Sequence, residues 1–151
     1  MRVVLDTNVL ARATPGRNSP AKQVLDALLV APHVLVSSEF LLTELGRALR
    51  YDRVRAIHGL DDAGIDAYVQ ALRDASLVVA LPPTVAVSTD PNDDPVIATA
   101  IEGQADVLCT WDNHLFAPAV QQHLTQVGVR VLRDTALLSE LQSPPPTTTN
   151  P

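Results

Sequence analysis

Cysteine, lysine and aromatic residues are all scarce in this sequence, and each shortage excludes something. The single Cys109 excludes an intrachain disulfide and a cysteine-based zinc cage. With aromatics at 3% and apolar residues at 46%, the core has to be built from Val, Leu, Ala and Ile. No apolar run approaches the ~18 residues of a membrane span, and Asp6 comes too early for a signal peptide. We therefore expect a globular, cytoplasmic protein with no membrane contact.

Positive charge is also in short supply. The 151 residues include 11 Lys+Arg against 17 Asp+Glu, a formal net charge of −6. Affinity for nucleic acid comes largely from Lys and Arg contacts to phosphates, so this balance by itself argues against such a partner. The positions of the acids therefore matter more than their number.

Several motifs of acid-rich α/β enzymes are missing. The sequence has no G-x-x-x-x-G-K-[ST] or G-x-G-x-x-G segment, which leaves nucleotide-cofactor functions without support. Haloacid-dehalogenase-like phosphatases and response-regulator receivers rely on a late lysine, but the only lysine is Lys22. Haloacid-dehalogenase-like phosphatases also need a second Asp two residues after the first, where this sequence has Asn8. None of the four histidines lies in a recognisable Ser/His/Asp context.

The sequence does contain alternating β-branched runs and amphipathic helical stretches. The expected strands are 2–5, 33–36, 77–81, 107–109 and 129–132, and the expected helices are 21–30, 38–50, 61–75, 94–101, 118–127 and 135–141. This alternation predicts an α/β protein, a three-layer α/β/α sandwich around a central, mostly parallel sheet. We expect one domain over residues 1–142 and a disordered Pro/Thr-rich tail over 143–151.

Acidic residues follow the expected strands at the edge where ligands bind in such folds. Asp6 follows the first strand and Asp112 follows the strand around 107–110, while Asp90, Asp93 and Asp94 crowd one loop and helix start. Ligands of open α/β sheets bind beyond the carboxyl ends of the strands, so these acids can converge. An all-oxygen cluster favours a hard cation such as Mg²⁺ or Mn²⁺.

Glu44 stands out on the helix 38–50. At 100° per residue it falls inside the apolar arc, between Phe40 and Leu41/Ala48. A carboxylate facing the core is costly unless it is paired or bound to a metal. A partner arginine, or a position at the edge of the apolar stripe, would explain it equally well.

Each aspartate also has a purely structural explanation. Asp6, Asp94 and Asp112 are all suited to capping a turn or helix, and Asp90 is suited to a turn. The set as a whole favours a site, because like charges packed together repel strongly unless a cation compensates them.

Four segments give a family resemblance. VVLDTNVL, SSEFLLTELGRAL, DPNDDPVIATA and VLCTWDNHLF match, in order and rough spacing, the four acidic motifs of the PIN domain, the fold of many VapC-like toxins. The resemblance covers about residues 2–140 and implies catalytic metal ligands Asp6, Glu44, Asp94 and Asp112, with Asp90, Asp93, Thr110 and Asn113 as auxiliary residues. Two departures are His114, where relatives often have another acid, and Pro95, where many have a basic residue.

The resemblance implies an endoribonuclease that uses Mg²⁺ or Mn²⁺ to hydrolyse RNA. It also implies the toxin role of a toxin–antitoxin pair, a cognate antitoxin and possible homodimerisation. A catalytically inactive PIN-fold module that binds RNA or protein is the alternative. Arg47, Arg50 and Arg53 are the expected RNA contacts, with Arg12 and Arg17 as weaker candidates; an ordinary solvated helix end would also explain the first set.

Overall fold

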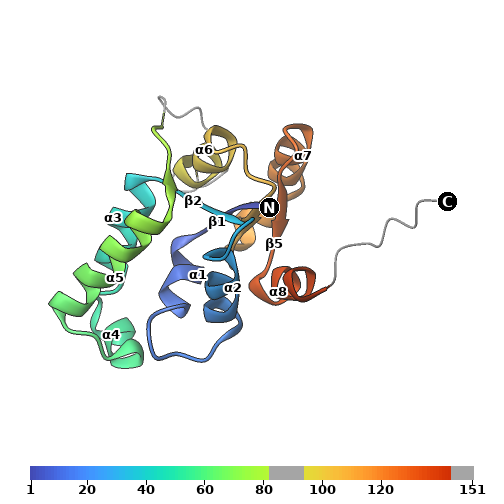
Figure 1. Cartoon of the computed structure of the whole chain (residues 1–151). Coiled ribbons are helices and arrows are strands. Elements are labelled where there is room, and N and C mark those ends of the chain that lie inside the picture. Colours follow the sequence, from blue (N-terminus) through green and yellow to red (C-terminus); the bar gives the residue numbers. More distant parts are fainter. Residues whose placement is uncertain (82–93, 144–151) are drawn as a thin grey trace.

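The computed structural model describes residues 1–81 and 94–143 and contains a five-stranded parallel sheet (Figure 1). The strand order is β3-β2-β1-β4-β5, and β1 lies at the centre. The strands are β1 (Arg2–Leu5), β2 (Val34–Ser37), β3 (Leu77–Val78), β4 (Val107–Cys109) and β5 (Arg130–Leu132). Every neighbouring pair is parallel; in the register Val3 lies opposite both Leu35 and Val107. The expected central parallel sheet is confirmed.

The helices that connect these strands follow the expected apolar periodicity, with two additions. They are α1 (Thr7–Arg12), α2 (Pro20–Leu28), α3 (Glu39–Ala48), α4 (Asp52–His58), α5 (Asp62–Ala75), α6 (Asp94–Glu102), α7 (Pro118–Gln126) and α8 (Asp134–Gln142), with a 3₁₀ turn η2 (Asn113–Phe116) before α7. The sequence did not predict α1 or α4. The first has only six residues, and the second buries none of its side chains, so neither shows an apolar period.

The two faces of the sheet are covered separately, because successive side chains of a strand point to opposite faces. Val3 and Leu5 of β1 pack in one apolar cluster with residues of α1, α2, α3, α5 and α8. Val4 packs in a second cluster on the other face, with residues of α6 and α7 and with Leu41 of α3. This arrangement confirms the three-layer α/β/α architecture (Figure 1).

Helix α6 runs in the direction opposite to the strands. Thr99 lies beside Ser38, directly after β2, with 2.9 Å between the two hydroxyl oxygens. One turn later, Gly103 packs against Val36 in the middle of β2. Because a helix rises about 1.5 Å per residue, the first residue of α6, Asp94, lies roughly 7 Å before Thr99 and beyond the carboxyl edge of β2.

Some expectations fall outside the residues that the structure describes. They are the loop around 82–92, with Asp90, and also Asp93, together with the tail after Ser143. The boundary between a domain and a disordered tail therefore stays a prediction. Within residues 1–81 and 94–143, none of the helices combines the length and the apolar character that crossing a bilayer requires.

The contact between α6 and β2 gives a first prediction. A Cβ on Gly103 would lie 2.3 Å from Val36 Cγ1 and 3.1 Å from the Thr99 carbonyl oxygen, so Gly103→Ala should cost about 1–3 kcal/mol of unfolding free energy. Gly46→Ala, inside α3, is the matched control, because the nearest atom to its new Cβ is Arg50 Nη1, 3.6 Å away at the end of a flexible side chain. Alanine there should stabilise the helix by up to about 1 kcal/mol. Equal effects in urea titrations would contradict the packing.

Candidate functional site

Asp6 is a buried carboxylate at the junction of β1 and α1. Its backbone N–H donates to the Cys109 carbonyl oxygen at 3.0 Å, so the pairing of β1 with β4 extends to this residue. Its Oδ1 accepts a 2.7 Å hydrogen bond from the Thr7 N–H and thereby caps α1. Only 5% of the residue is exposed. The capping role that its sequence position suggested is present, but it occupies only one of the two oxygens.

The second oxygen of Asp6 is bonded to Thr110, which follows β4. The Thr110 hydroxyl donates to Asp6 Oδ2 at 2.8 Å and accepts from the Asp112 N–H at 2.9 Å. A hydroxyl has one proton to donate, so donation to Asp6 leaves the Thr110 oxygen as the acceptor for Asp112. Thr110 is fully buried. It therefore joins two carboxylate-bearing segments that lie 106 residues apart in the sequence (112 − 6).

Burial and a second carboxylate oppose ionisation of Asp6. Burial is the largest effect and raises the pKa of Asp6; the hydrogen bonds from Thr110 and Thr7 lower this pKa, and the charge of Asp112 raises it. In the part of the chain that the structure describes, no Lys or Arg forms an ion pair with either aspartate. The basic side chain beside Asp112 is His114, whose Nδ1 lies 3.2 Å from Asp112 Oδ1.

The structure distinguishes the two explanations that the sequence left open for Glu44. Its side chain is 38% exposed and forms an ion pair with Arg47 Nη1, which confirms the partner arginine at the edge of the apolar stripe and not a carboxylate facing the core. The buried face of α3 is formed by Leu41, Leu42 and Leu45, so Glu44 lies at the border of this face. Phe40, assigned to the same apolar arc, is 40% exposed. Apolar side chains flank Glu44 in a helical projection, but not all of them are buried.

Of the predicted acids, the structure brings Asp6 and Asp112 together and leaves the others unassigned. Asp94 begins α6 beyond the carboxyl edge of the sheet, and its side chain lies outside the described part of the chain, as do Asp90 and Asp93. Within the described residues no three His, Cys, Asp or Glu side chains are arranged to hold a metal ion.

Arg133, which the sequence analysis did not single out, fixes the segment that carries Asp112. Its guanidinium carbon lies 4.8 Å from the Trp111 ring centroid and 4.1 Å from that of Phe116. Its Nη2 donates to Asn113 Oδ1 at 2.6 Å, which accounts for the Asn113 side chain. A cation over aromatic rings is stabilising, so Arg133 holds this loop against the end of β5. The position of Arg133 directly after an expected strand is the sequence feature that could have identified it as a residue near the site.

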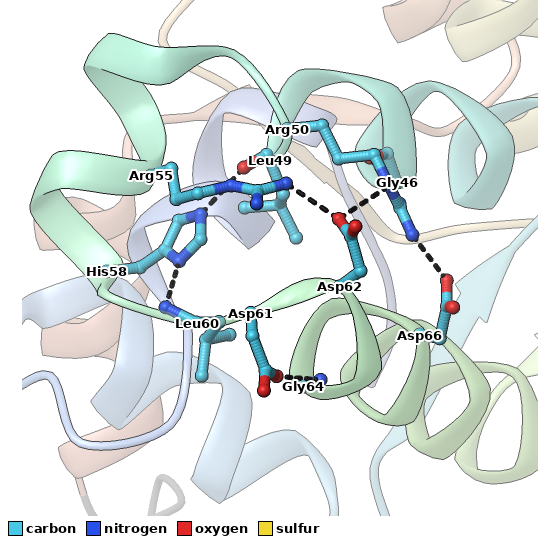
Figure 2. A network of polar contacts seen from close by, with 10 residues as sticks. All are labelled: Gly46, Leu49, Arg50, Arg55, His58, Leu60, Asp61, Asp62, Gly64 and Asp66. Atoms are coloured by element: carbon cyan, nitrogen blue, oxygen red, sulfur yellow. Dashed lines mark hydrogen bonds and ion pairs between the residues drawn. The ribbon is translucent and has the colours of Figure 1, made fainter.

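The arginines near Glu44 have different surroundings. Arg47 pairs with Glu44, whereas Arg50 donates to Asp66 at 2.7 Å and to the Gly46 carbonyl oxygen at 2.9 Å (Figure 2). These bonds tie the end of α3 to α5. Arg53, the second residue of α4, is exposed and has no carboxylate partner among the described residues. The RNA contacts expected of Arg47 and Arg50 would require these pairs to open.

The fold and the acidic strand ends define a class, an α/β protein whose ligand site lies at the carboxyl edge of a parallel sheet. A model of the PIN domain matches residues 2–114, which is more than half of the chain, so this protein belongs to the PIN domain family. PIN domains are generally nucleases and typically bind divalent metal ions. No curated protein sequence matches the chain significantly.

The donor chemistry at Asp6 fits such an ion. Burial raises the pKa of Asp6, the charge of the nearby Asp112 adds to this effect, and no described Lys or Arg compensates the two carboxylates. Thr110 donates to Asp6 Oδ2 from one side only and leaves a lone pair of this oxygen for a cation. Hard divalent cations prefer such oxygen ligands, although two carboxylates alone do not complete a coordination shell.

The raised pKa of Asp6 gives a pH prediction for the metal-free protein. Unfolded Asp6 releases its proton near 3.8, but the folded protein retains it to higher pH, so ionisation lowers stability as pH rises through that window. In urea titrations with EDTA, Asp6→Asn should therefore become progressively more stable relative to wild type as pH rises above 3.8.

The control for this experiment is Asp61→Asn, which changes the exposed N-cap carboxylate of α5. It shows what loss of a cap carboxylate does at an exposed position, apart from burial. A stability difference for Asp6→Asn that is flat in pH, or that shifts toward wild type as pH rises, would contradict the electrostatic account.

Proposed function

We propose that this protein is a metal-dependent endoribonuclease. The observation that carries the proposal is the arrangement of Asp6: a buried carboxylate, hydrogen-bonded by Thr110, with Asp112 beside it and no described basic partner for the two except His114. A pure binding module would gain only repulsion from such a pair. A bound divalent cation would remove the repulsion and offset the desolvation.

The proposed metal ligands are Asp6, Glu44, Asp94 and Asp112. Asp94 is included because α6 begins beyond the same edge of the sheet that Asp6 and Asp112 follow. Glu44 belongs to α3, which packs against α1, and would exchange its ion pair with Arg47 for the metal. Asp90 and Asp93 are proposed as auxiliary acids, and Asn113 as a residue that positions the Asp112 segment through Arg133.

Within this proposal each residue has a separate task. When bound, Mg²⁺ or Mn²⁺ supplies an activated water and neutralises charge on the scissile phosphate. Asp6 and Asp94 hold the ion, and Thr110 keeps Asp6 oriented by occupying one side of Oδ2. Asp112 and Glu44 complete the shell or orient the attacking water, whose proton either carboxylate can accept.

Metal binding can be tested without any substrate. Mn²⁺ or Mg²⁺ at about 100 times its Kd should stabilise the wild-type fold by about 2.7 kcal/mol, seen as a rise in Tm. Asp6→Asn should lose most of this shift, because it removes a ligand charge while keeping the cap. An equal rise in Tm for both proteins would place the metal elsewhere.

RNA hydrolysis is the direct test of the activity. Total RNA incubated with Mn²⁺ or Mg²⁺ should be cleaved by wild type, and Asp6→Asn should be slower by about 100-fold or more, since metal catalysis is worth several kcal/mol. Glu44→Gln should also be impaired, while Glu39→Gln serves as its control, because Glu39 pairs with Arg73 at the start of the same helix. Equal RNA decay with wild type and Asp6→Asn would refute the proposal.

The alternative is an inactive module that binds RNA or protein. It has one observation in its favour, the ion pair that occupies Glu44. This alternative predicts RNA binding without decay in the wild type and no loss of binding in Glu44→Gln.

We further propose a toxin role, supported by the resemblance of the four acidic motifs to those of VapC-like toxins. An uncontrolled ribonuclease would harm its host, so a cognate antitoxin is expected, and homodimerisation and a cytoplasmic location belong to the same proposal. A gene for a small DNA-binding protein immediately upstream would support it. Absence of any such gene would favour a housekeeping nuclease.

A further inference from the structure

A groove of about 510 Å³ lies between α1 and α4, next to the proposed active site. We call it the arginine groove, because Arg12, Arg17 and Arg53 line it together with Tyr51. Thr7 and Asn8, the two residues that follow Asp6, also line it. The groove therefore includes the direct sequence neighbours of the buried carboxylate.

The charge of the groove is positive and largely uncompensated. None of the described residues that line it is acidic. Arg17 and Arg53 have no carboxylate partner within the described chain, and Arg12 lies over the Trp111 ring at 4.7 Å. This distinguishes them from Arg50, Arg55 and Arg73, whose guanidinium groups are all in ion pairs. The guanidinium groups in the groove can contact phosphates in pairs of hydrogen bonds.

The aromatic residues at the groove suit a base. Tyr51 is 53% exposed on the α4 side, in a sequence that contains only two tyrosines. Beside the groove, the backbone N–H of Trp111 donates to Asn8 Oδ1 at 3.1 Å, and the Trp111 ring centroid lies 4.7 Å from the Arg12 guanidinium carbon. Arginines that track a backbone beside an aromatic platform are typical of sites for single-stranded nucleic acid.

The wall that carries Tyr51 and Arg53 is held in two ways. Val54 of α4 packs, partly buried, against the core, and polar contacts supply the rest, since α4 has no fully buried side chain. Arg55 donates to Asp62 at 2.7 Å, and His58 Nε2 lies 2.8 Å from the Leu49 carbonyl oxygen (Figure 2). These bonds join α4 to the end of α3 and the start of α5. The groove is thus preformed, which lowers the entropy cost of binding.

We propose that a single-stranded part of the RNA substrate lies in the arginine groove. Its phosphates contact Arg12, Arg17 and Arg53, one base stacks on Tyr51, and the strand continues past Thr7 and Asn8 to Asp6. That the ligand is RNA rests on the proposed function. The groove adds a preference for single strands, and RNA bound there leaves Arg47 and Arg50 in their ion pairs.

The test measures binding in EDTA, where no metal-dependent cleavage occurs. The probe is a fluorescein-labelled single-stranded RNA of about ten nucleotides, within the usual site size, followed by fluorescence anisotropy. Arg17→Gln/Arg53→Gln should weaken binding on the order of tenfold and reduce the salt slope by about 0.7 for each phosphate that an arginine no longer neutralises. Arg12→Gln should act in the same direction.

The matched control is Arg73→Gln/Arg130→Gln, which removes the same charge from arginines paired with Glu39 and Glu140. It should change affinity by less than about twofold, as expected of exposed ion pairs away from the site. Tyr51→Leu should weaken binding about fivefold or more, and Tyr51→Phe should retain it, because stacking requires the ring alone. Tm values confirm that each variant is folded.

Three results would overturn the proposal: no RNA binding by wild type, equal losses of affinity in the two double variants, or tight binding of duplex RNA. Binding of a polyglutamate peptide as tight as that of RNA, unchanged in Tyr51→Leu, would instead indicate an acidic protein partner. The proposed activity is judged separately. If wild type degrades RNA but the groove variants bind RNA as well as wild type does, only the proposed role of the groove is wrong. If RNA binds specifically in the groove but is not degraded, the role of the groove is supported and the proposed nuclease activity is refuted.

Discussion

All five strands of the sheet run in one direction, and the positions of the proposed acidic residues at the strand ends depend on this constraint. A parallel sheet brings the carboxyl ends of its strands to one edge, so residues far apart in sequence leave the core together. Asp6 and Thr110 meet there because β1 and β4 are neighbours. Asp94 lies beyond the same edge for the opposite reason, since α6 runs back against the strands.

The carboxylates at this edge of the sheet also lower the stability of the fold. An ionised carboxylate with 5% exposure is disfavoured, and a second one beside it increases the cost. Hydrogen bonds from Thr7 and Thr110 offset part of it but supply no opposite charge. The protein therefore tolerates a locally unfavourable arrangement in exchange for a preorganised anionic site, as expected where function rather than stability determines the residues.

Sequence patterns predicted the strands and most helices because their apolar periods reflect burial in two well-defined layers. They missed α4, because only Val54 of this helix packs against the core and its other contacts are polar, which leaves no apolar period in the sequence. They left two explanations open for Glu44, since a helical projection shows which residues share a face but not where burial on that face stops. Thr110 was identified only through its motif; its bond to Asp6 follows from strand order, which local patterns do not specify.

The net charge of −6 must be judged against this distribution. Arg50, Arg55, Arg73 and Arg130 are paired within the fold, so they add little to any attraction for a polyanion. The acids at the sheet edge, in turn, weaken the attraction for RNA, and a bound cation would reduce this effect without being required for binding in the groove. Substrate affinity then rests on the few arginines of the groove and should decrease steeply with salt. A small number of arginines next to a metal site can outweigh the net charge, because phosphates respond to the local field.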